Sequence, residues 1–160
     1  EANKLVVDNE TIEEKVVAFT AKIGEKISFR RFEKLTKTES QEFGIYSHMG
    51  GKITSVVVLE GKNPEVAKDI AMHVAAMNPS YLTSNDIPED VLNKEGRIRK
   101  FFKEVCLVEQ ECIKDSSLSV GNYAKNNNCS IVKMVRYEVG EGIEKRNDDF
   151  AAEVMNQING

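Results

Sequence analysis

The sequence predicts an α+β fold in which a few antiparallel strands pack with helices. Helical periodicities alternate with short apolar runs along the chain, a Gly50-Gly51 pair separates two such runs, and residues 129–139 form the strongest strand pattern. A Gly-Gly pair between β-rich segments is typical of a hairpin, because glycine adopts positive φ without strain. A small number of strands mixed with helices indicates an α+β architecture.

The first helix is predicted over residues 10–23, where apolar side chains recur at helical spacing and Gly24 follows as a natural stop. Residues 26–32 then alternate between apolar and polar side chains, which predicts a half-buried strand. Two more strands, 43–47 and 53–59, flank the Gly-Gly turn. The second of these is almost continuously apolar, so we expect it at the centre of the sheet.

The second half of the chain begins with Asn63 and Pro64, which favour a helix start, and the helix should end at Asn78-Pro79. The elements expected after it are a short helix from Glu89, a helix over 96–108, a short helix capped by Ser119, the strand 129–139, a Gly140-Glu-Gly142 turn and a closing helix over about 148–158.

Composition excludes several classes of protein. The chain has 160 residues, of which 41% are hydrophobic and 30% charged, as in a folded domain or two small lobes. Its 22 basic and 26 acidic residues give a net charge of −4, which argues against direct nucleic-acid binding. No apolar run is long enough to span a membrane, and the charged start does not resemble a signal peptide. The chain begins without Met, so we expect a fragment or a trimmed chain.

The three cysteines, Cys106, Cys112 and Cys129, are odd in number and form no Cys-x-x-Cys motif. Neither a disulfide framework nor a zinc site is therefore expected, and a cytoplasmic location fits best. Buried or incidental thiols are the favoured interpretation, with a thiol enzyme as a remote alternative.

No other group of residues predicts bond-breaking chemistry. His73 lies on the apolar stripe of its predicted helix, so we expect a buried, hydrogen-bonded, structural histidine. His48 lies at the predicted hairpin tip, where it can be either a bystander or a binding residue. The Gly140-Glu-Gly142 turn lacks the residues of a phosphate loop. We expect no catalytic residue, no metal and no cofactor.

Four segments, in order along the chain, resemble the elongation factor Ts family over about residues 12–155. They are Ala21-Lys-Ile-Gly-Glu25 with Arg30-Arg31, Ile70-Ala-Met-His-Val-Ala-Ala76 with Pro79, Phe102 through Gln110, and Arg136 through Val154. The resemblance implies a core of two subdomains, each a small antiparallel sheet packed with helices, and a C-terminal helix. The corresponding ranges are 1–80, 81–145 and 146–160.

The resemblance also implies a partner and a function. Members of the family bind elongation factor Tu, in its GDP and nucleotide-free forms, and promote GDP release by protein contact rather than by catalysis. The alternative is a binding or dimerisation module of the same fold without exchange activity, and a homodimer stays open. By position, the partner-binding residues are Ile23, Gly24, Tyr46, His48, Ile113, Lys114, Phe150, Ala151, Val154 and Met155. We expect His48 and Tyr46 at an exposed tip, and Ile113, Phe150 and Val154 partly exposed.

The sequence also departs from the family. It lacks the N-terminal ubiquitin-associated-like module and the Thr-Asp-Phe-Val motif whose Asp and Phe disturb the nucleotide site. Glu111-Cys112 replaces a common Pro-Phe pair. Many members carry a helical hairpin where Glu95 here runs directly into Gly96, so we expect residues to be missing at that junction and a Glu95–Gly96 Cα distance well above the usual 3.8 Å or so.

Overall fold

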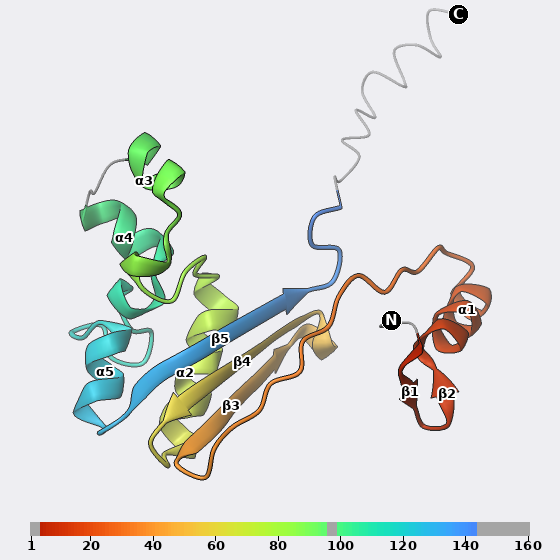
Figure 1. The fold of residues 1–160 in the computed structure, drawn as a ribbon, viewed down its shortest axis with the longest axis horizontal. Helices are drawn as coiled ribbons and strands as arrows, with labels where there is room; N and C mark the ends of the chain where they lie inside the picture. The colour runs from red at the N-terminus through yellow and green to blue at the C-terminus, as the bar shows by residue number, and fades with distance from the viewer. Residues whose placement is uncertain (1–3, 96–98, 144–160) are drawn as a thin grey trace, which may run out of the picture. The chain divides into compact units, whose positions relative to one another are not determined.

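The computed structural model describes residues 4–95 and 99–143 (Figure 1). It has an α+β fold with two small antiparallel sheets and several helices, which confirms the predicted fold class. The chain divides into two compact units, Glu1–Thr36 and Lys37–Gly160. The boundaries predicted at 80/81 and 145/146 follow the family's subdomains and stay a prediction. The predicted C-terminal helix lies outside the described residues.

The first unit contains a short hairpin followed by a helix. Strand β1 (Val6–Val7) pairs with β2 (Glu10–Thr11), and helix α1 (Ile12–Ile23) follows directly. Asp8 and Asn9 close the hairpin with φ of 54° and 69°, a region that Asp and Asn tolerate better than most residues. Strands of two residues are shorter than any pattern visible in the sequence, so this hairpin was not predicted.

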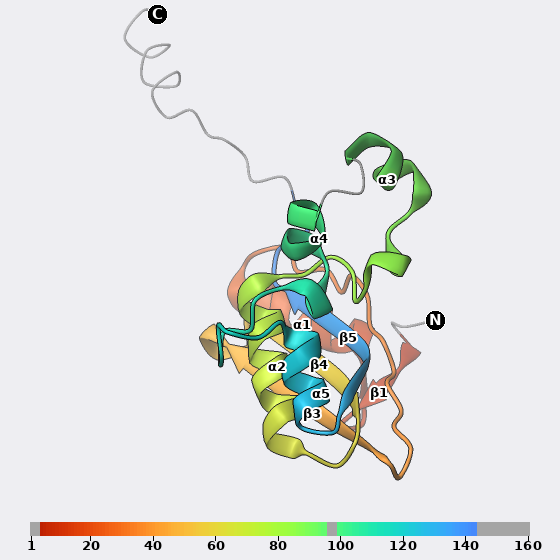
Figure 2. The same cartoon turned by 90° about the vertical axis from the view of Figure 1, so that its left-hand side faces the viewer.

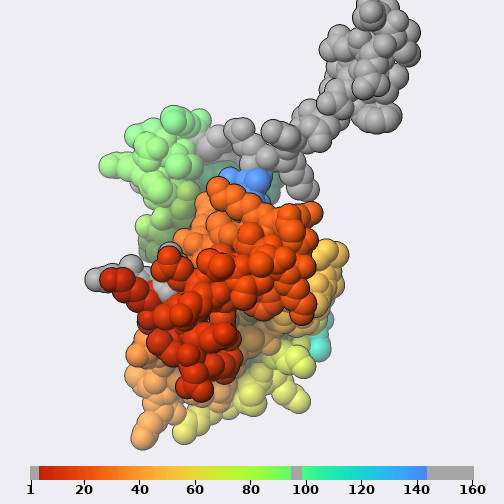
Figure 3. Space-filling view, turned by 90° about the vertical axis from the view of Figure 1, so that its right-hand side faces the viewer, coloured from red at the N-terminus to blue at the C-terminus, as the bar shows by residue number. Residues whose placement is uncertain are grey.

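Helix α1 is stabilised by hydrogen bonds at its two ends rather than by burial of its side chains. The Thr11 hydroxyl accepts a hydrogen bond from the Glu14 amide, and the Glu14 carboxylate accepts one from the Thr11 amide, which together form a capping box. Gly24 ends the helix in the left-handed region, as predicted. No residue of α1 is buried within the described structure, and its atoms are among the red ones of Figure 3.

The prediction of a strand over residues 26–32 is wrong. These residues have no regular secondary structure, and no described strand pairs with them. Alternation of apolar and polar side chains indicates only that the backbone is extended and that one of its sides is apolar. A β-strand also needs a hydrogen-bonded neighbour, which the local pattern does not reveal.

The second unit is built on a three-stranded antiparallel sheet in the order β3 (Gln41–His48), β4 (Ile53–Glu60), β5 (Ser130–Glu138). The central position predicted for β4 is confirmed, and its adjacent residues Val57 and Val58, which face opposite sides of the sheet, are both buried. The predicted Gly50-Gly51 hairpin is also confirmed, because both glycines have positive φ, within the 3₁₀ turn Met49–Gly51.

Helix α2 (Pro64–Met77) packs on one face of this sheet, with the Asn63 cap and the Asn78 stop that the sequence predicts. The approach is closest at Gly44 of β3, where an added Cβ atom would lie 1.9 Å from the Ala67 carbonyl oxygen. The core is formed by buried residues of the sheet, α2 and α5 together with the segment 107–112.

The remaining helices are short. They are α3 (Glu89–Glu95), α4 (Arg99–Val105) and α5 (Val120–Asn126), with 3₁₀ turns at Ser84–Asp86 and Leu107–Glu109. The helix predicted over 96–108 thus ends early, because Cys106 bridges to Tyr81 and the Leu107 amide donates to the Tyr81 carbonyl at 2.9 Å. Helix α5 begins after the predicted Ser119 cap and lies beside α2 (Figure 2). Within the described residues, no helix is long and apolar enough to cross a membrane.

Candidate protein-contact site

The groups that could carry nucleophilic or metal chemistry are not arranged for it in the described part of the chain. Cys106, Cys112 and Cys129 are all buried as free thiols. Burial raises the pKa of Cys106 and of Cys129, which opposes the thiolate that a nucleophile requires. Among residues 4–95 and 99–143, no group of three or more His, Cys, Asp or Glu side chains could hold a metal ion.

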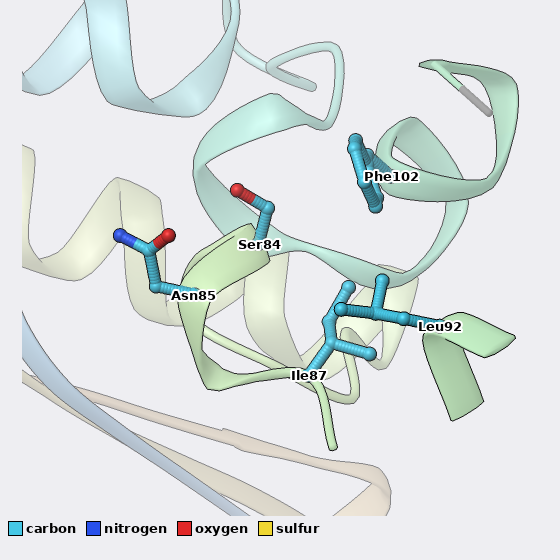
Figure 4. Close-up of a pocket in the computed structure, with 5 residues that line it drawn as sticks. All are labelled: Ser84, Asn85, Ile87, Leu92 and Phe102. Atoms are coloured by element: carbon cyan, nitrogen blue, oxygen red, sulfur yellow. The ribbon is translucent and has the colours of Figure 1, made fainter. Parts of the chain in front are cut away.

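One pocket, with both polar and apolar lining, lies between the 3₁₀ turn Ser84–Asp86 and helices α3 and α4. Figure 4 shows Phe102 facing Ile87 and Leu92 across a space of about 320 Å³, with Ser84 at its side. The lining side chains include one hydroxyl and one amide, and no histidine, carboxylate or amine stands among them to activate either group. The pocket therefore offers shape rather than chemistry.

The tip of the β3–β4 hairpin holds two of the predicted contact residues. His48 is exposed at the end of β3, as predicted, and its Nδ1 lies 3.3 Å from the Tyr46 hydroxyl. The two rings stack with centroids 6.1 Å apart. Together with Met72, Ala75 and Ala76 of α2, they line a small apolar pocket of about 100 Å³.

Tyr46 differs from the expectation of an exposed residue. It is half-buried and packs against the core. Its position explains this, because Tyr46 lies on the same face of β3 as Gly44, the face that α2 covers. Tyr46 therefore supports His48 at the tip.

The second predicted contact is the loop that follows Gln110. Ile113 is 45% exposed, which confirms the predicted partial exposure of this apolar side chain. Lys114 is exposed, and its Nζ lies 3.3 Å from Oδ1 of Asp69 on α2. The other Asp69 oxygen accepts a 2.8 Å hydrogen bond from the Tyr123 hydroxyl, so α2 connects the loop to α5.

His73 is fully buried beneath this loop, as the sequence predicts. Its Nδ1 accepts a hydrogen bond from the Ile113 amide at 3.3 Å, and its Nε2 lies 3.0 Å from Oε1 of Gln110. The Gln110 amide nitrogen donates in turn to the Glu104 carbonyl at 2.8 Å. Burial lowers the pKa of His73, with the Gln110 bond opposing the shift, and keeps the ring neutral.

These interactions were invisible in the sequence. His73 and Ile113 are separated by 40 positions, and His73 and Gln110 by 37. The only available signal was the placement of a histidine on an otherwise apolar helical stripe, which predicts a buried partner without naming it.

The remaining predicted contact residues belong to other parts of the chain. Ile23 is 57% exposed at the end of α1, and Gly24 beside it has a φ of 78°, both in the first unit. Phe150, Ala151, Val154 and Met155 lie outside the described residues, so their predicted exposure and docking role stay predictions.

Within the second unit, the candidate contacts have a common support. The hairpin tip lies against Met72, Ala75 and Ala76 of α2, and the loop at Ile113 and Lys114 is held by Asp69 and His73 of the same helix. These positions lie on neighbouring sides of a helix with 3.6 residues per turn. Helix α2 therefore fixes both segments relative to each other.

The fold and this geometry define an α+β protein that presents apolar and imidazole side chains on a hairpin and a loop rather than around a reactive centre. The chain belongs to the elongation factor Ts family, whose model, described as "Elongation factor TS", matches residues 1–98 and 94–141.

Curated relatives named "Elongation factor Ts" align along most of the chain. The protein of Limosilactobacillus reuteri (strain DSM 20016) is 41% identical over 182 residues, covering 99% of this chain and 62% of the relative. That of Acholeplasma laidlawii (strain PG-8A) is 44% identical over 176 residues, covering 93% and 60%, and that of Lacticaseibacillus casei (strain BL23) is 42% identical over 176 residues, covering 96% and 60%. The chain thus spans about three-fifths of the length of these relatives.

The predicted junction at Glu95–Gly96 coincides with a break in the family match. The two matched segments meet at residues 94–98, and an alignment of 182 positions exceeds the 160 residues of this chain, so the relative carries additional residues within the aligned region. Residues 96–98 lie outside the described structure, so the predicted Cα separation stays a prediction.

Proposed function

We propose that this chain acts in translation elongation, by binding elongation factor Tu and promoting the release of GDP from it. Family membership supports the partner. The observation that carries the proposal is the exposure of His48 and Ile113 on two segments that contact the same helix, α2. An exposed apolar side chain on a fixed backbone suits a protein contact, because little entropy is lost when it binds.

The mechanism requires no covalent step. If the chain and GDP each bind elongation factor Tu but strain one another in the ternary complex, each lowers the other's affinity by the same factor. His48, Tyr46, Ile113 and Lys114 supply the proposed contacts of the second unit. Ile23 and Gly24 supply those of the first, and the helix bearing Phe150, Ala151, Val154 and Met155 supplies a further docking contact. Such a factor acts in the cytoplasm and has no need of direct nucleic-acid binding.

Stopped-flow release of a fluorescent GDP analogue from elongation factor Tu tests the proposal. The chain should accelerate release in proportion to its concentration, up to saturation. A variant with alanine at both His48 and Ile113 is the matched control and should lose most of the acceleration while keeping its fold. If a saturating concentration of the chain binds elongation factor Tu but leaves the rate of GDP release unchanged, the exchange function is contradicted.

The second candidate is a binding or dimerisation module without exchange activity. The same experiment separates the two candidates, because this module would bind elongation factor Tu or itself without changing the rate of GDP release. Sedimentation of the chain alone distinguishes self-association from binding to the partner.

A further inference from the structure

The geometry points to His73, together with Gln110, as a positioning residue that holds Ile113 in place for the partner contact. This inference rests on the proposed function, and it extends that function to two buried residues to which the family resemblance gives no role. His73 is fully buried and Gln110 is 2% exposed, so neither can touch a partner directly. They can therefore affect a partner only through the residue that they position, Ile113.

The direction of each hydrogen bond follows from the groups at the two ends. The Ile113 amide can only donate, so Nδ1 of His73 must be an unprotonated acceptor. At the other end, Gln110 uses its amide nitrogen on the Glu104 carbonyl, which leaves Oε1 facing Nε2 of His73 as an acceptor. Both ends therefore require the same neutral ring, with its proton on Nε2.

The chain of bonds runs from helix α4 to an exposed loop. It begins at the Glu104 carbonyl, passes through Gln110 and His73, and ends at the backbone of Ile113. Gln110 is fixed independently, because its own amide donates to Cys106 and its carbonyl accepts from Val120 at 2.9 Å. The last bond is thus anchored on a rigid base.

The hydrogen bond from the Ile113 amide to His73, called the tether below, restrains the part of the loop between two other fixed points. Cys112, just before Ile113, is buried and its amide donates to the Leu118 carbonyl at 2.9 Å, which closes the loop. Asp115 orders the far side through Ser117. Between these two points the backbone amide of Ile113 donates to His73, and the side chain of Lys114 bonds to Asp69. Loss of the His73 bond leaves the exposed Ile113 side chain without a fixed direction.

Two substitutions of His73 each remove a different one of the two hydrogen bonds that its ring makes. His73→Asn places an amide oxygen where Nδ1 stands and keeps the acceptor for Ile113, but it is too short to reach Gln110. His73→Gln reaches toward Gln110 but removes the acceptor for Ile113. Each variant loses one buried hydrogen bond, so their losses of thermal stability should be comparable. They differ in whether the loop stays tethered.

Affinity for elongation factor Tu and amide hydrogen exchange at Ile113 are measured on the full chain and both variants. The His73→Gln variant should bind roughly threefold to tenfold more weakly than wild type, the effect of one lost hydrogen bond. Its Ile113 amide should exchange at least roughly tenfold faster. The His73→Asn variant should stay close to wild type in both measurements. Equal weakening by the two variants overturns the inference.

A double-mutant cycle with Ile113→Ala distinguishes positioning from general destabilisation. If His73 acts through Ile113, His73→Gln should have little further effect on affinity in the Ile113→Ala background. A merely structural role would weaken binding by the same factor in both backgrounds, which overturns the inference. A wild-type chain that does not bind elongation factor Tu overturns the proposed function instead, while the exchange data still decide whether the tether exists.

A measurement on wild type keeps the inference testable should both variants fail to fold. The nitrogen-15 chemical shifts of the His73 ring distinguish a protonated from an unprotonated nitrogen. An unprotonated Nδ1 and a protonated Nε2 are expected. The opposite tautomer cannot accept the Ile113 amide and overturns the inference.

Discussion

His48 and Tyr46 are two residues apart on β3 and contact each other, but their environments differ. His48 is exposed at the strand end, whereas Tyr46 is half-buried beneath α2 and belongs partly to the core. A substitution at Tyr46 therefore mixes effects on binding with effects on stability. A substitution at His48 reports on the surface alone.

His48→Ala should weaken binding to elongation factor Tu by about fivefold or more, corresponding to about 1 kcal/mol, because a central contact side chain is removed. The free energy of unfolding should change by less than about 0.5 kcal/mol, as at other exposed positions. Titration calorimetry and chemical denaturation measure the two effects. Ser47→Ala, next to His48 but on the other face of the strand, is the control and should leave affinity unchanged. Unaltered affinity in His48→Ala removes this residue from the contact.

The buried His73 ring should make stability depend on pH. Burial lowers its pKa in the folded chain, so the unfolded chain binds a proton first as the pH falls below the ordinary histidine value of about 6.5. The stabilisation is present in full above that pH and is lost progressively as the pH falls toward the folded pKa. Denaturant titrations at pH 7.5 and 5.5 should show this loss in wild type, and His73→Asn should reduce it. An equal loss in both proteins excludes His73 as the source.

Helix α2 is the element on which the second unit depends. Its buried face supplies much of the core, and its side chains hold both candidate contact segments. Arg136 of β5 donates to the Ala75 carbonyl near the helix end at 3.2 Å, where a positive charge also interacts favourably with the helix dipole. Displacement of α2 would therefore disturb the sheet and the candidate site together.

Gly44→Ala should destabilise the second unit strongly, by about 3 kcal/mol, because the new Cβ would overlap the Ala67 backbone and force α2 away from the sheet. Gly140→Ala is the matched control. Its φ of 81° imposes strain, but nothing lies within 4 Å of the added Cβ, so the cost should be about 1 kcal/mol. Thermal and chemical denaturation compare the two variants. Similar costs would show that α2 can move away from β3 without penalty.

Capping residues and turn glycines in the sequence correctly predicted the helix and hairpin whose ends they form. Asn63, Pro64 and Asn78 bound α2 in the structure as they do in the sequence, and the glycine pair forms the expected hairpin. Residues 26–32 show where such signals fail, since strand pairing depends on a neighbour distant in the chain. The exposure of His48 was predictable from the glycine turn beside it, whereas that of Ile113 was expected only from the family resemblance. The tether from His73 to Ile113 was not predictable, because it arises only when α2 and the loop fold together.

The chain spans about three-fifths of the length of its curated relatives, and within the aligned region the relative carries additional residues. The family match divides at residues 94–98, where helix α3 ends at Glu95 and helix α4 begins at Arg99. The break therefore falls at the end of α3 and before the described residues of α4. An additional segment at this point would interrupt none of the described helices or strands.

A flexible insertion at the Glu95–Gly96 junction should therefore be tolerated. About ten Gly and Ser residues placed there should change the free energy of unfolding by less than about 1 kcal/mol, because lengthening a loop adds only a small closure entropy. The same insertion between Asn127 and Asn128 is the control. There the Asn128 and Cys129 amides close the turn between α5 and β5 by bonds of 3.0 Å and 2.9 Å to Lys125 and Ala124, and the cost should be larger.

Denaturant unfolding of the two insertion variants against the parent chain measures this difference. A small loss at Glu95–Gly96 and a larger one at Asn127–Asn128 would mark the first position as the point where relatives accommodate their additional residues. Comparable large losses would mean instead that α3 and α4 depend on their direct connection, and that this chain has a shortened structure of its own there. Ile87, Leu92 and Phe102 line a pocket beside the same two helices, so a change in how α3 and α4 are joined would then also alter the packing of these side chains.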